Sequence, residues 1–194
     1  MTRQSAYQLL TKYIKNPILL KHSLATEATM RAFANYFGED EDVWGITGLL
    51  HDADYELSKG HPEKHGTLLF KKEPNVVPAE IERAIRAHTY EWSNVLPQTR
   101  MEWTLACCDE LTGFIMKTVT FYASRKVADI SVDFLLRKLR QKNVFPGADR
   151  KKILLCQSKL GIPVVQFITV TLNAMHSISN ILDTKLEAEK ETKK

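Results

Sequence analysis

Apolar side chains recur every three or four residues along most of the chain, and the alternating pattern typical of strands is scarce. Residues at that spacing share one face of a helix, which can pack its apolar side against a neighbour. The pattern therefore predicts an all-α fold, built as a helical bundle. The expected helices cover roughly residues 7–14, 19–37, 43–51, 62–72, 78–88, 99–123, 133–142, 149–160 and 164–186.

Residues that commonly end or start helices mark several of these boundaries. Asn16-Pro17 ends the first helix, Gly38 closes the second, and the acidic run at 39–42 suits the positive N-terminal end of the third. The chain has no internal repeat and no long linker, so we expect a single domain over residues 1–194. Its expected parts are a core at 18–123, additional packing helices at 124–186 and a fraying lysine-rich tail at 187–194.

The composition is ordinary for a globular protein, with 44% hydrophobic and 26% charged residues among 194. A chain of this length buries about two-thirds of its unfolded surface. The first residues do not resemble a secretory signal, and the longest apolar stretch, 162–170, is too short to span a bilayer. We therefore expect a cytoplasmic protein with no membrane partner, whose three cysteines are reduced and buried.

The net charge of +4 is concentrated in one segment. Residues 125–152 contain nine Lys or Arg and three Asp, a local balance of +6. Such a segment can attract phosphate groups or nucleic acid, but a solvated helix face is the commoner explanation of a charge run. Nucleic acid is therefore not the partner we expect.

Histidines and inward carboxylates are the residues that suggest chemistry. Five of the six histidines fall between His22 and His88. The helical period places His22 on the face shared by Ala25, Thr29, Ala32 and Tyr36. It places Asp109 on the face shared by Leu105, Thr112 and Met116. A carboxylate on such a face needs a cation nearby, because burying it alone would cost several kcal/mol.

The adjacent pair His51-Asp52 follows a strongly apolar helix, where the chain must turn into a loop. Inside a helix the two side chains would diverge by about 100°, but at a helix end both can point to one ion. A single inward His is more often a hydrogen-bonded core residue, and a buried Asp is more often a cap or an ion-pair partner. The joint order of these residues is what favours a metal site.

That order is His22, then His51-Asp52, then Asp109, on successive helices. It resembles the HD superfamily of metal-dependent phosphohydrolases, which is named after the adjacent pair. The local strings are similar to a subgroup of small HD-domain proteins over roughly residues 18–180. These strings are Lys21-His22-Ser23-Leu24-Ala25, Leu49-Leu50-His51-Asp52-Ala53-Asp54-Tyr55-Glu56, His61-Pro62 and Asp109-Glu110-Leu111-Thr112-Gly113.

The resemblance implies an HD-domain helical bundle in which His22, His51, Asp52 and Asp109 bind one divalent metal. In members with two metals, Asp52 bridges the ions and histidines from the intervening helices complete the second site. By order and spacing, His61 and His88 match those added positions. His65 lies four residues after His61 and could replace or support it, whereas a wet helix surface is an equally good explanation of both.

A divalent metal would activate a water molecule and polarise a phosphoryl oxygen, so no reactive side chain is required as nucleophile. Mixed His and carboxylate ligands suit Mn, Fe, Co, Ni or Zn, in one or two ions. Asp54 and Glu56 are candidates for a general acid or base, or for orienting a ligand histidine. Both are equally explained as surface loop carboxylates.

The expected substrate is a nucleotide or another small phosphorylated molecule. The chain has no Gly-rich phosphate loop and no GxSxG motif, so neither a nucleotide switch nor a serine hydrolase is indicated. Positive groups that could bind the phosphate include Lys21 and, as our predicted substrate-binding residues, Arg83, Arg86, Arg125 and Lys126. A homodimer is left open.

Two other functions fit the same residues. One is a di-iron oxygenase of the HD type, in which a His-rich pair of irons activates O₂ in place of water. The other is a non-catalytic helical domain that a metal stabilises and that binds a nucleotide or a protein partner. Elemental analysis of the purified protein decides between no metal, one ion and two, an O₂-uptake assay with iron analysis tests the oxygenase, and turnover on phosphorylated substrates tests the hydrolase against the binding domain.

Overall fold

A computed structural model describes residues 1–141 and 149–183 of the chain. The described residues form helices and no strand, which confirms the all-α prediction. The α-helices are α1 (Arg3–Tyr13), α2 (Pro17–Phe37), α3 (Glu41–Leu50), α4 (Leu68–Lys72), α5 (Ala79–His88), α6 (Tyr90–Ser93), α7 (Arg100–Val119), α8 (Val132–Arg140), α9 (Arg150–Leu160), α10 (Val164–Ser177) and α11 (Ser179–Leu182), with short 3₁₀ helices η1 (Pro62–Lys64) and η2 (Val127–Asp129).

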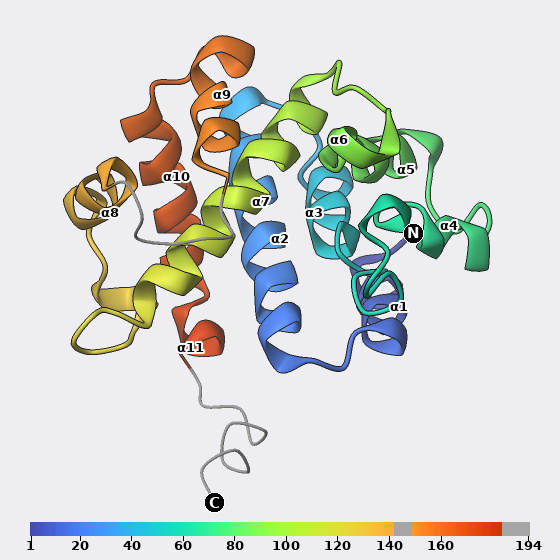
Figure 1. Ribbon diagram of the computed structural model, residues 1–194, viewed down its shortest axis with the longest axis horizontal. Coiled ribbons are helices and arrows are strands. Elements are labelled where there is room, and N and C mark those ends of the chain that lie inside the picture. Colours follow the sequence, from blue (N-terminus) through green and yellow to red (C-terminus); the bar gives the residue numbers. More distant parts are fainter. Residues whose placement is uncertain (142–148, 184–194) are drawn as a thin grey trace, which may run out of the picture.

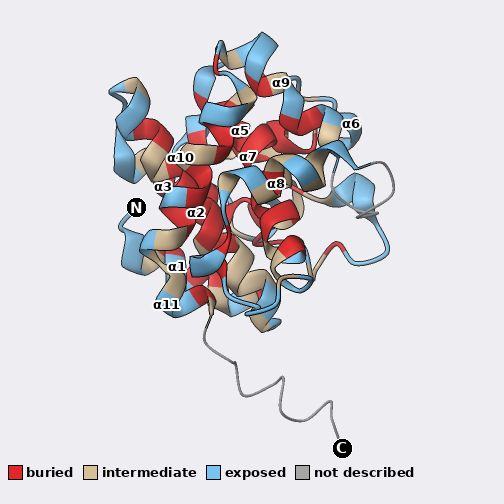
Figure 2. Ribbon diagram, turned by 90° about the vertical axis from the view of Figure 1, so that its left-hand side faces the viewer, coloured by how far each residue is buried: buried red, intermediate tan, exposed pale blue. Residues whose placement is uncertain are grey.

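Helix α2 runs through the middle of the molecule, with α1 and α3 on one side and α7 and α10 on the other (Figure 1). Buried residues line both α2 and α7 (Figure 2). Two hydrophobic clusters form the core. One contains residues of α2, α7, α9 and α10, including the stacked rings of Phe33 and Phe167, and the other joins α1, α3, α4 and α5. Helix α2 therefore lies where the two clusters meet.

The helix boundaries follow the signals in the sequence. Asn16 accepts a hydrogen bond from the backbone N–H of Ile18 with Pro17 in the first turn, and Gly38 ends α2 in the left-handed conformation at φ 72°. Asp40 accepts from two backbone N–H groups at the start of α3. These caps satisfy backbone groups that a helix end leaves without partners.

Gly48 permits a close approach between α2 and α3. A Cβ atom at this position would lie 2.8 Å from the backbone oxygen of Thr26 and 2.8 Å from the Met30 side chain. Real Cβ contacts are almost never that short, so a larger residue would push the two helices apart. The contact matters for the site because His22 lies on α2 and His51 follows α3.

The predicted single helix over 62–72 is wrong. The segment forms η1, then an extended residue at His65 and a left-handed Gly66 at φ 76°, before α4 begins. The backbone N–H groups of Gly66, Leu68 and Leu69 bind the Asp54 carboxylate. This tertiary contact replaces the hydrogen bonds that a continuous helix would have made.

Smaller departures lie in the last third. Helix α7 ends at Val119, and the helix expected over 164–186 is broken into α10 and α11 at Ile178. The expected tail at 187–194 lies outside the described residues, and the division into core and packing helices stays a prediction. All three cysteines are buried free thiols, as expected.

Within the described part of the chain, no single helix has the length and apolar character needed to cross a bilayer. One bent pair, α9 with α10, meets those criteria only when the two helices are taken together, across a bend of 109°.

Candidate metal centre

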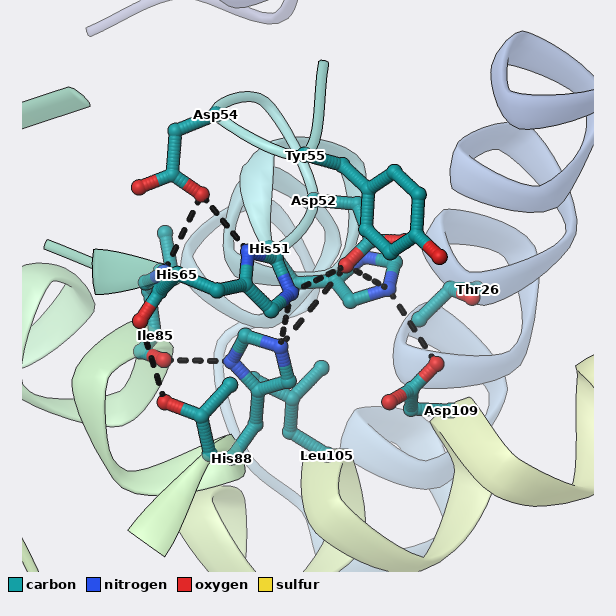
Figure 3. Close-up of polar contacts among 12 residues, drawn as sticks. Thr26, His51, Asp52, Asp54, Tyr55, His65, Ile85, His88, Leu105 and Asp109 are labelled. Carbon is teal, nitrogen blue, oxygen red and sulfur yellow. Dashed lines mark hydrogen bonds and ion pairs between the residues drawn. The ribbon is translucent and has the colours of Figure 1, made fainter. Parts of the chain in front are cut away.

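His and Asp side chains from separate segments point toward one another, and Figure 3 labels His51, Asp52, His65, His88 and Asp109 among them. They lie on α2, just after α3, in the turn that follows η1, at the C-terminal end of α5 and in the middle of α7. Six residues form this cluster: His22, His51, Asp52, His65, His88 and Asp109. The five segments are far apart in sequence, so only the packing of the helices brings these groups together.

Four of these residues form what we call the first half-site: His22, His51, Asp52 and Asp109. His22 Nε2 lies 2.9 Å from Asp109 Oδ1 and 3.2 Å from His51 Nε2. His51 Nε2 lies 3.3 Å from the same Asp109 oxygen and 3.4 Å from Asp52 Oδ1. These are the four residues expected to bind the first metal.

The second half-site consists of Asp52, His65 and His88. His65 Nε2 lies 3.0 Å from Asp52 Oδ1 and 3.3 Å from His88 Nε2. His88 Nε2 lies 3.7 Å from the same Asp52 oxygen. Within His22, His51 and Asp52, and again within Asp52, His65 and His88, the ligand atoms all lie within 4.8 Å of one another. Asp52 is therefore shared between two groups that could each hold an ion.

Hydrogen bonds from Nδ1 orient two of the histidines. His51 Nδ1 donates to the backbone carbonyl of Gly48 at 2.7 Å, and His88 Nδ1 donates to that of Ile85. Both acceptors lie near a helix C-terminus, where carbonyl groups lack helical partners. Because Nδ1 carries the hydrogen, Nε2 of the neutral ring presents a lone pair to the centre of the cluster.

Asp54 orients His65. Its carboxylate, which is almost fully buried, accepts from His65 Nδ1 at 2.8 Å and from the backbone N–H groups that start α4. Burial alone would raise the pKa of Asp54, but the hydrogen bonds from His65, Gly66 and Leu69 outweigh it and lower that pKa. Asp54 is thus an ionised support for His65, one of the two roles expected for it.

His22 is oriented through a threonine of α7. Thr112 Oγ1 donates to the Asp109 backbone carbonyl at 2.9 Å and lies 3.4 Å from His22 Nδ1. Because the Thr112 hydroxyl hydrogen is donated to the Asp109 carbonyl, the Thr112 oxygen accepts a hydrogen bond from His22 Nδ1. The first half-site therefore also has its His22 Nε2 turned inward.

The carboxylates of the cluster are ionised. Burial would raise the pKa of both Asp52 and Asp109, but neighbouring histidines hold both pKa values well below the usual range: His51 and His65 for Asp52, and His22 and His51 for Asp109. Two buried negative charges require positive partners close by.

Two histidines supply that charge when no metal is bound. Burial would lower the pKa of His51, but Asp52 and Asp109 raise it to about 9. Burial would also lower the pKa of His65, but Asp52 and Asp54 raise it to about 10. Burial and the neighbouring imidazoles lower the pKa of His88, so this ring is neutral. Protons therefore occupy positions that a metal would take.

Among the residues that the structure describes, Asp109, His65 and His22 form the exposed side of the cluster. The side chains of His51 and His88 are almost completely buried, whereas 20% of Asp109, 14% of His65 and 12% of His22 is exposed. Leu105 and Ile85 lie beside the buried histidines (Figure 3). Solvent and any ligand therefore reach the cluster past Asp109, His22 and His65.

Two predicted site residues lie elsewhere. His61 has a 58% exposed side chain and contacts Glu63, because it precedes η1 and its ring points to solvent. His65 occupies the position in the second half-site that was expected for His61. Glu56 accepts from the backbone N–H groups of Lys15 and Asn16, and thereby ties the turn after α3 to the start of α2. Its expected acid–base role has no geometric support.

The four predicted phosphate-binding cations are also not at the cluster. Arg83 pairs with Glu102, and Arg86 pairs with Glu82 at 2.6 Å, so both stabilise contacts of α5. Arg125 and Lys126 follow the far end of α7, which extends about 15 Å beyond Asp109. The partner of Arg83 lies on another helix, so the sequence could not reveal it, whereas the i, i+4 spacing of Glu82 and Arg86 is a local signal.

Lys152 is a buried cation near the cluster that the sequence did not reveal. Its Nζ donates to the His88 backbone carbonyl at 3.0 Å and lies 3.2 Å from Glu91 and 3.7 Å from Glu110. Burial and the adjacent Asp109 raise the pKa of Glu110 to about 7. In the sequence Lys152 was one member of a basic run, so nothing distinguished it from its solvated neighbours.

Comparisons with known proteins agree with this geometry. Residues 19–113 match the family model of the HD domain, and this segment contains all six residues of the cluster. Searches of curated proteins and of solved structures each gave no significant match. The ordered His, His-Asp and Asp of the first half-site fall inside the matched segment, and the chain therefore belongs to the HD superfamily.

Proposed function

We propose that this protein is a metal-dependent phosphohydrolase that acts on a nucleotide or another small phosphorylated molecule. The observation that carries the proposal is the sharing of Asp52 between two groups of inward-facing ligand atoms. HD domains bind divalent metals and are typical of metal-dependent phosphohydrolases, which supports the same reading at the level of the family.

The donor set fits a divalent transition metal. Four imidazole nitrogens and two carboxylates suit Mn, Fe, Co, Ni or Zn better than Ca. Ligands about 2.1 Å from an ion lie about 3.0 to 3.4 Å from one another in octahedral or tetrahedral geometry. The distances that join His22 and His51 to each other and to Asp52 and Asp109 range from 2.9 to 3.6 Å, close to the separations expected between two ligands of one ion.

The residues of the cluster would hold the metal ions, and their neighbours would orient them. A bound divalent ion lowers the pKa of a water ligand and polarises a phosphoryl oxygen. His22, His51, Asp52 and Asp109 would hold one ion, and His65 and His88 with Asp52 would hold a second. Asp54 keeps His65 in its ligand orientation, and the buried His51 and His88 exclude water from the inner side of the site.

Phosphate release tests the proposal. Protein loaded with Mn²⁺ is assayed on a panel of phosphomonoesters, phosphodiesters and nucleotides. We expect activity that Asp52→Asn lowers by about 10³-fold or more, since the metal supplies several kcal/mol of transition-state stabilisation. Asp129→Asn, an exposed carboxylate of η2, is the control and should keep full activity.

Other outcomes favour the alternative functions. O₂ uptake by iron-loaded protein, with no phosphate release, would favour an oxygenase. Bound metal with no turnover on the whole panel, and an Asp52→Asn variant that loses only stability, would favour a binding domain.

A further inference from the structure

Tyr55 stands next to the second half-site. Its ring lies 5.4 Å from the His65 ring, at an interplanar angle of 89°. The backbone fixes its position, since Tyr55 N–H donates to the Asp52 carbonyl at 2.9 Å and Ser58 Oγ donates to the Tyr55 carbonyl at 3.1 Å. In Figure 3 the ring lies beside Asp52, with the hydroxyl group directed away from Asp54.

The exposure of Tyr55 is notable only because of this location. The residue is 49% exposed, and single exposed aromatic residues are common on protein surfaces. Within residues 1–141 and 149–183, however, the Tyr55 hydroxyl has no hydrogen-bond partner, whereas the Tyr13 hydroxyl binds Glu73. His65, which the ring touches, is one of the three ligand residues on the open side of the cluster.

A ligand held at the cluster would have to extend past its exposed residues. A phosphoryl group held at the cluster would extend the rest of its molecule toward the open side, because His51 and His88 close the other side. Tyr55 presents an aromatic ring there. Two of the predicted cations, Arg83 and Arg86, are each paired with a glutamate, so the ring is a better candidate than these two for recognising the rest of the molecule.

We infer that the Tyr55 ring stacks on the organic group of the substrate, which is then a phosphate ester carrying a flat ring. The inference rests on the proposed phosphohydrolase function and adds the class of substrate. Aromatic rings that meet in this way contribute about 0.5–1.5 kcal/mol beyond the area they bury, which corresponds to a preference of about two- to tenfold.

A pair of phosphonates isolates the ring contact from the phosphate contact. Phenylphosphonate and methylphosphonate carry the same anionic group, and their C–P bond is not a substrate for ester hydrolysis. The binding of each to Mn²⁺-loaded protein is measured by titration calorimetry, together with the metal content. We expect the wild-type protein to bind phenylphosphonate about two- to tenfold more tightly than methylphosphonate.

Three variants locate that preference. Tyr55→Leu keeps an apolar side chain against His65 but removes the ring, so the preference should disappear while metal content stays unchanged. Tyr55→Phe keeps the ring and should keep the preference. Tyr36→Leu is the matched control, because Tyr36 is 47% exposed and lies about 21 Å from His22 along α2.

The outcomes separate this inference from the proposed function. A preference that survives Tyr55→Leu, or that Tyr55→Phe abolishes, overturns ring stacking, as does a wild-type protein without any preference. An equal loss of both phosphonates in Tyr55→Leu also overturns it, because that result indicates a general disturbance of the site. If neither phosphonate requires the metal for binding, the phosphohydrolase proposal itself fails, and the inference with it.

Discussion

The two half-sites share Asp52 but are held in different ways. In the first, His22 and Asp109 lie within the regular helices α2 and α7. In the second, His65 lies in an irregular turn and depends on the buried Asp54, while His88 ends a helix whose last carbonyl binds Lys152. The first half-site therefore depends on helix packing, and the second depends on individual hydrogen bonds.

The difference indicates which substitutions should disturb metal binding at each half-site. Packed helices present their side chains in few orientations, so a ligand within them is fixed by the core as a whole. A ligand in a turn is fixed by one or two polar partners, and losing one of them frees the side chain. We therefore expect substitutions around the second half-site to affect one ion, and substitution of the shared carboxylate to affect both.

The largest expected effect is that of Asp52→Asn on metal content. The substitution removes the charged oxygen that both half-sites share, so we expect metal content to fall from two ions per chain to none. Elemental analysis after gel filtration measures this, with Asp129→Asn as the control. A variant that still held one ion would mean that the two half-sites do not depend equally on Asp52.

The next largest effect is the difference in metal content between the variants of two neighbouring histidines, His65 and His61. His65→Ala should remove the ion of the second half-site and leave that of the first, because His65 lies 3.0 Å from Asp52. His61→Ala should leave both ions, because the His61 ring is mostly exposed and, among the described residues, pairs with Glu63 and not with the cluster. Metal analysis of the two variants side by side provides the comparison, and the reverse result would restore His61 as the ligand.

A smaller effect is expected from the support of His65. Asp54→Asn should weaken the second ion by about 10- to 100-fold and leave the first unchanged, as is typical when the hydrogen-bond partner of a ligand is removed. Glu56→Gln is the matched control from the same turn, because the Glu56 carboxylate accepts from the backbone N–H groups of Lys15 and Asn16 and, within the described part of the chain, contacts no residue of the cluster. Calorimetric titration with Mn²⁺ measures both affinities. An equal loss at the two half-sites would contradict the difference proposed here.

The last prediction concerns the dependence of metal affinity on pH. The pKa values of about 9 for His51 and about 10 for His65 mean that both rings hold a proton at neutral pH when the metal is absent. Metal binding must displace these protons, so the affinity should rise by about tenfold per pH unit for each proton displaced, and fall correspondingly as the pH is lowered.

Calorimetry in two buffers of different ionisation enthalpy counts the protons released. His65→Ala should release one fewer than the wild-type protein. If metal affinity were independent of pH between 7 and 8, neither imidazole would be protonated in the metal-free protein, and the account of the cluster's charge would be incorrect.

The sequence predicted most of the fold because its signals are local. The three-to-four-residue spacing and the caps at Asn16, Gly38 and Asp40 depend only on neighbouring residues. The helix over 62–72 could not be excluded in this way. The Asp54 carboxylate accepts hydrogen bonds from backbone N–H groups of that segment, which lie more than ten residues away in sequence. No local pattern reveals such a contact.

The same limit applies to the candidate site. The order His22, His51-Asp52 and Asp109 sufficed to propose a first half-site, whose four residues the structure brings together, although their binding of metal stays a prediction. The sequence matched His61 to the second site by order and spacing, but it could not show that Asp54 holds the ring of His65, four residues later, toward the cluster. The carboxylates that surround Lys152 and Arg83 come from other helices, so the sequence could not show which of the two cations lies near the cluster.

An anomalous difference map from crystals of the Mn²⁺-loaded protein tests the central claim most directly. The account predicts two peaks on either side of the Asp52 carboxylate, one among His22, His51 and Asp109 and the other between His65 and His88. A map with no peak near Asp52, or with manganese bound only at other carboxylates, would contradict it.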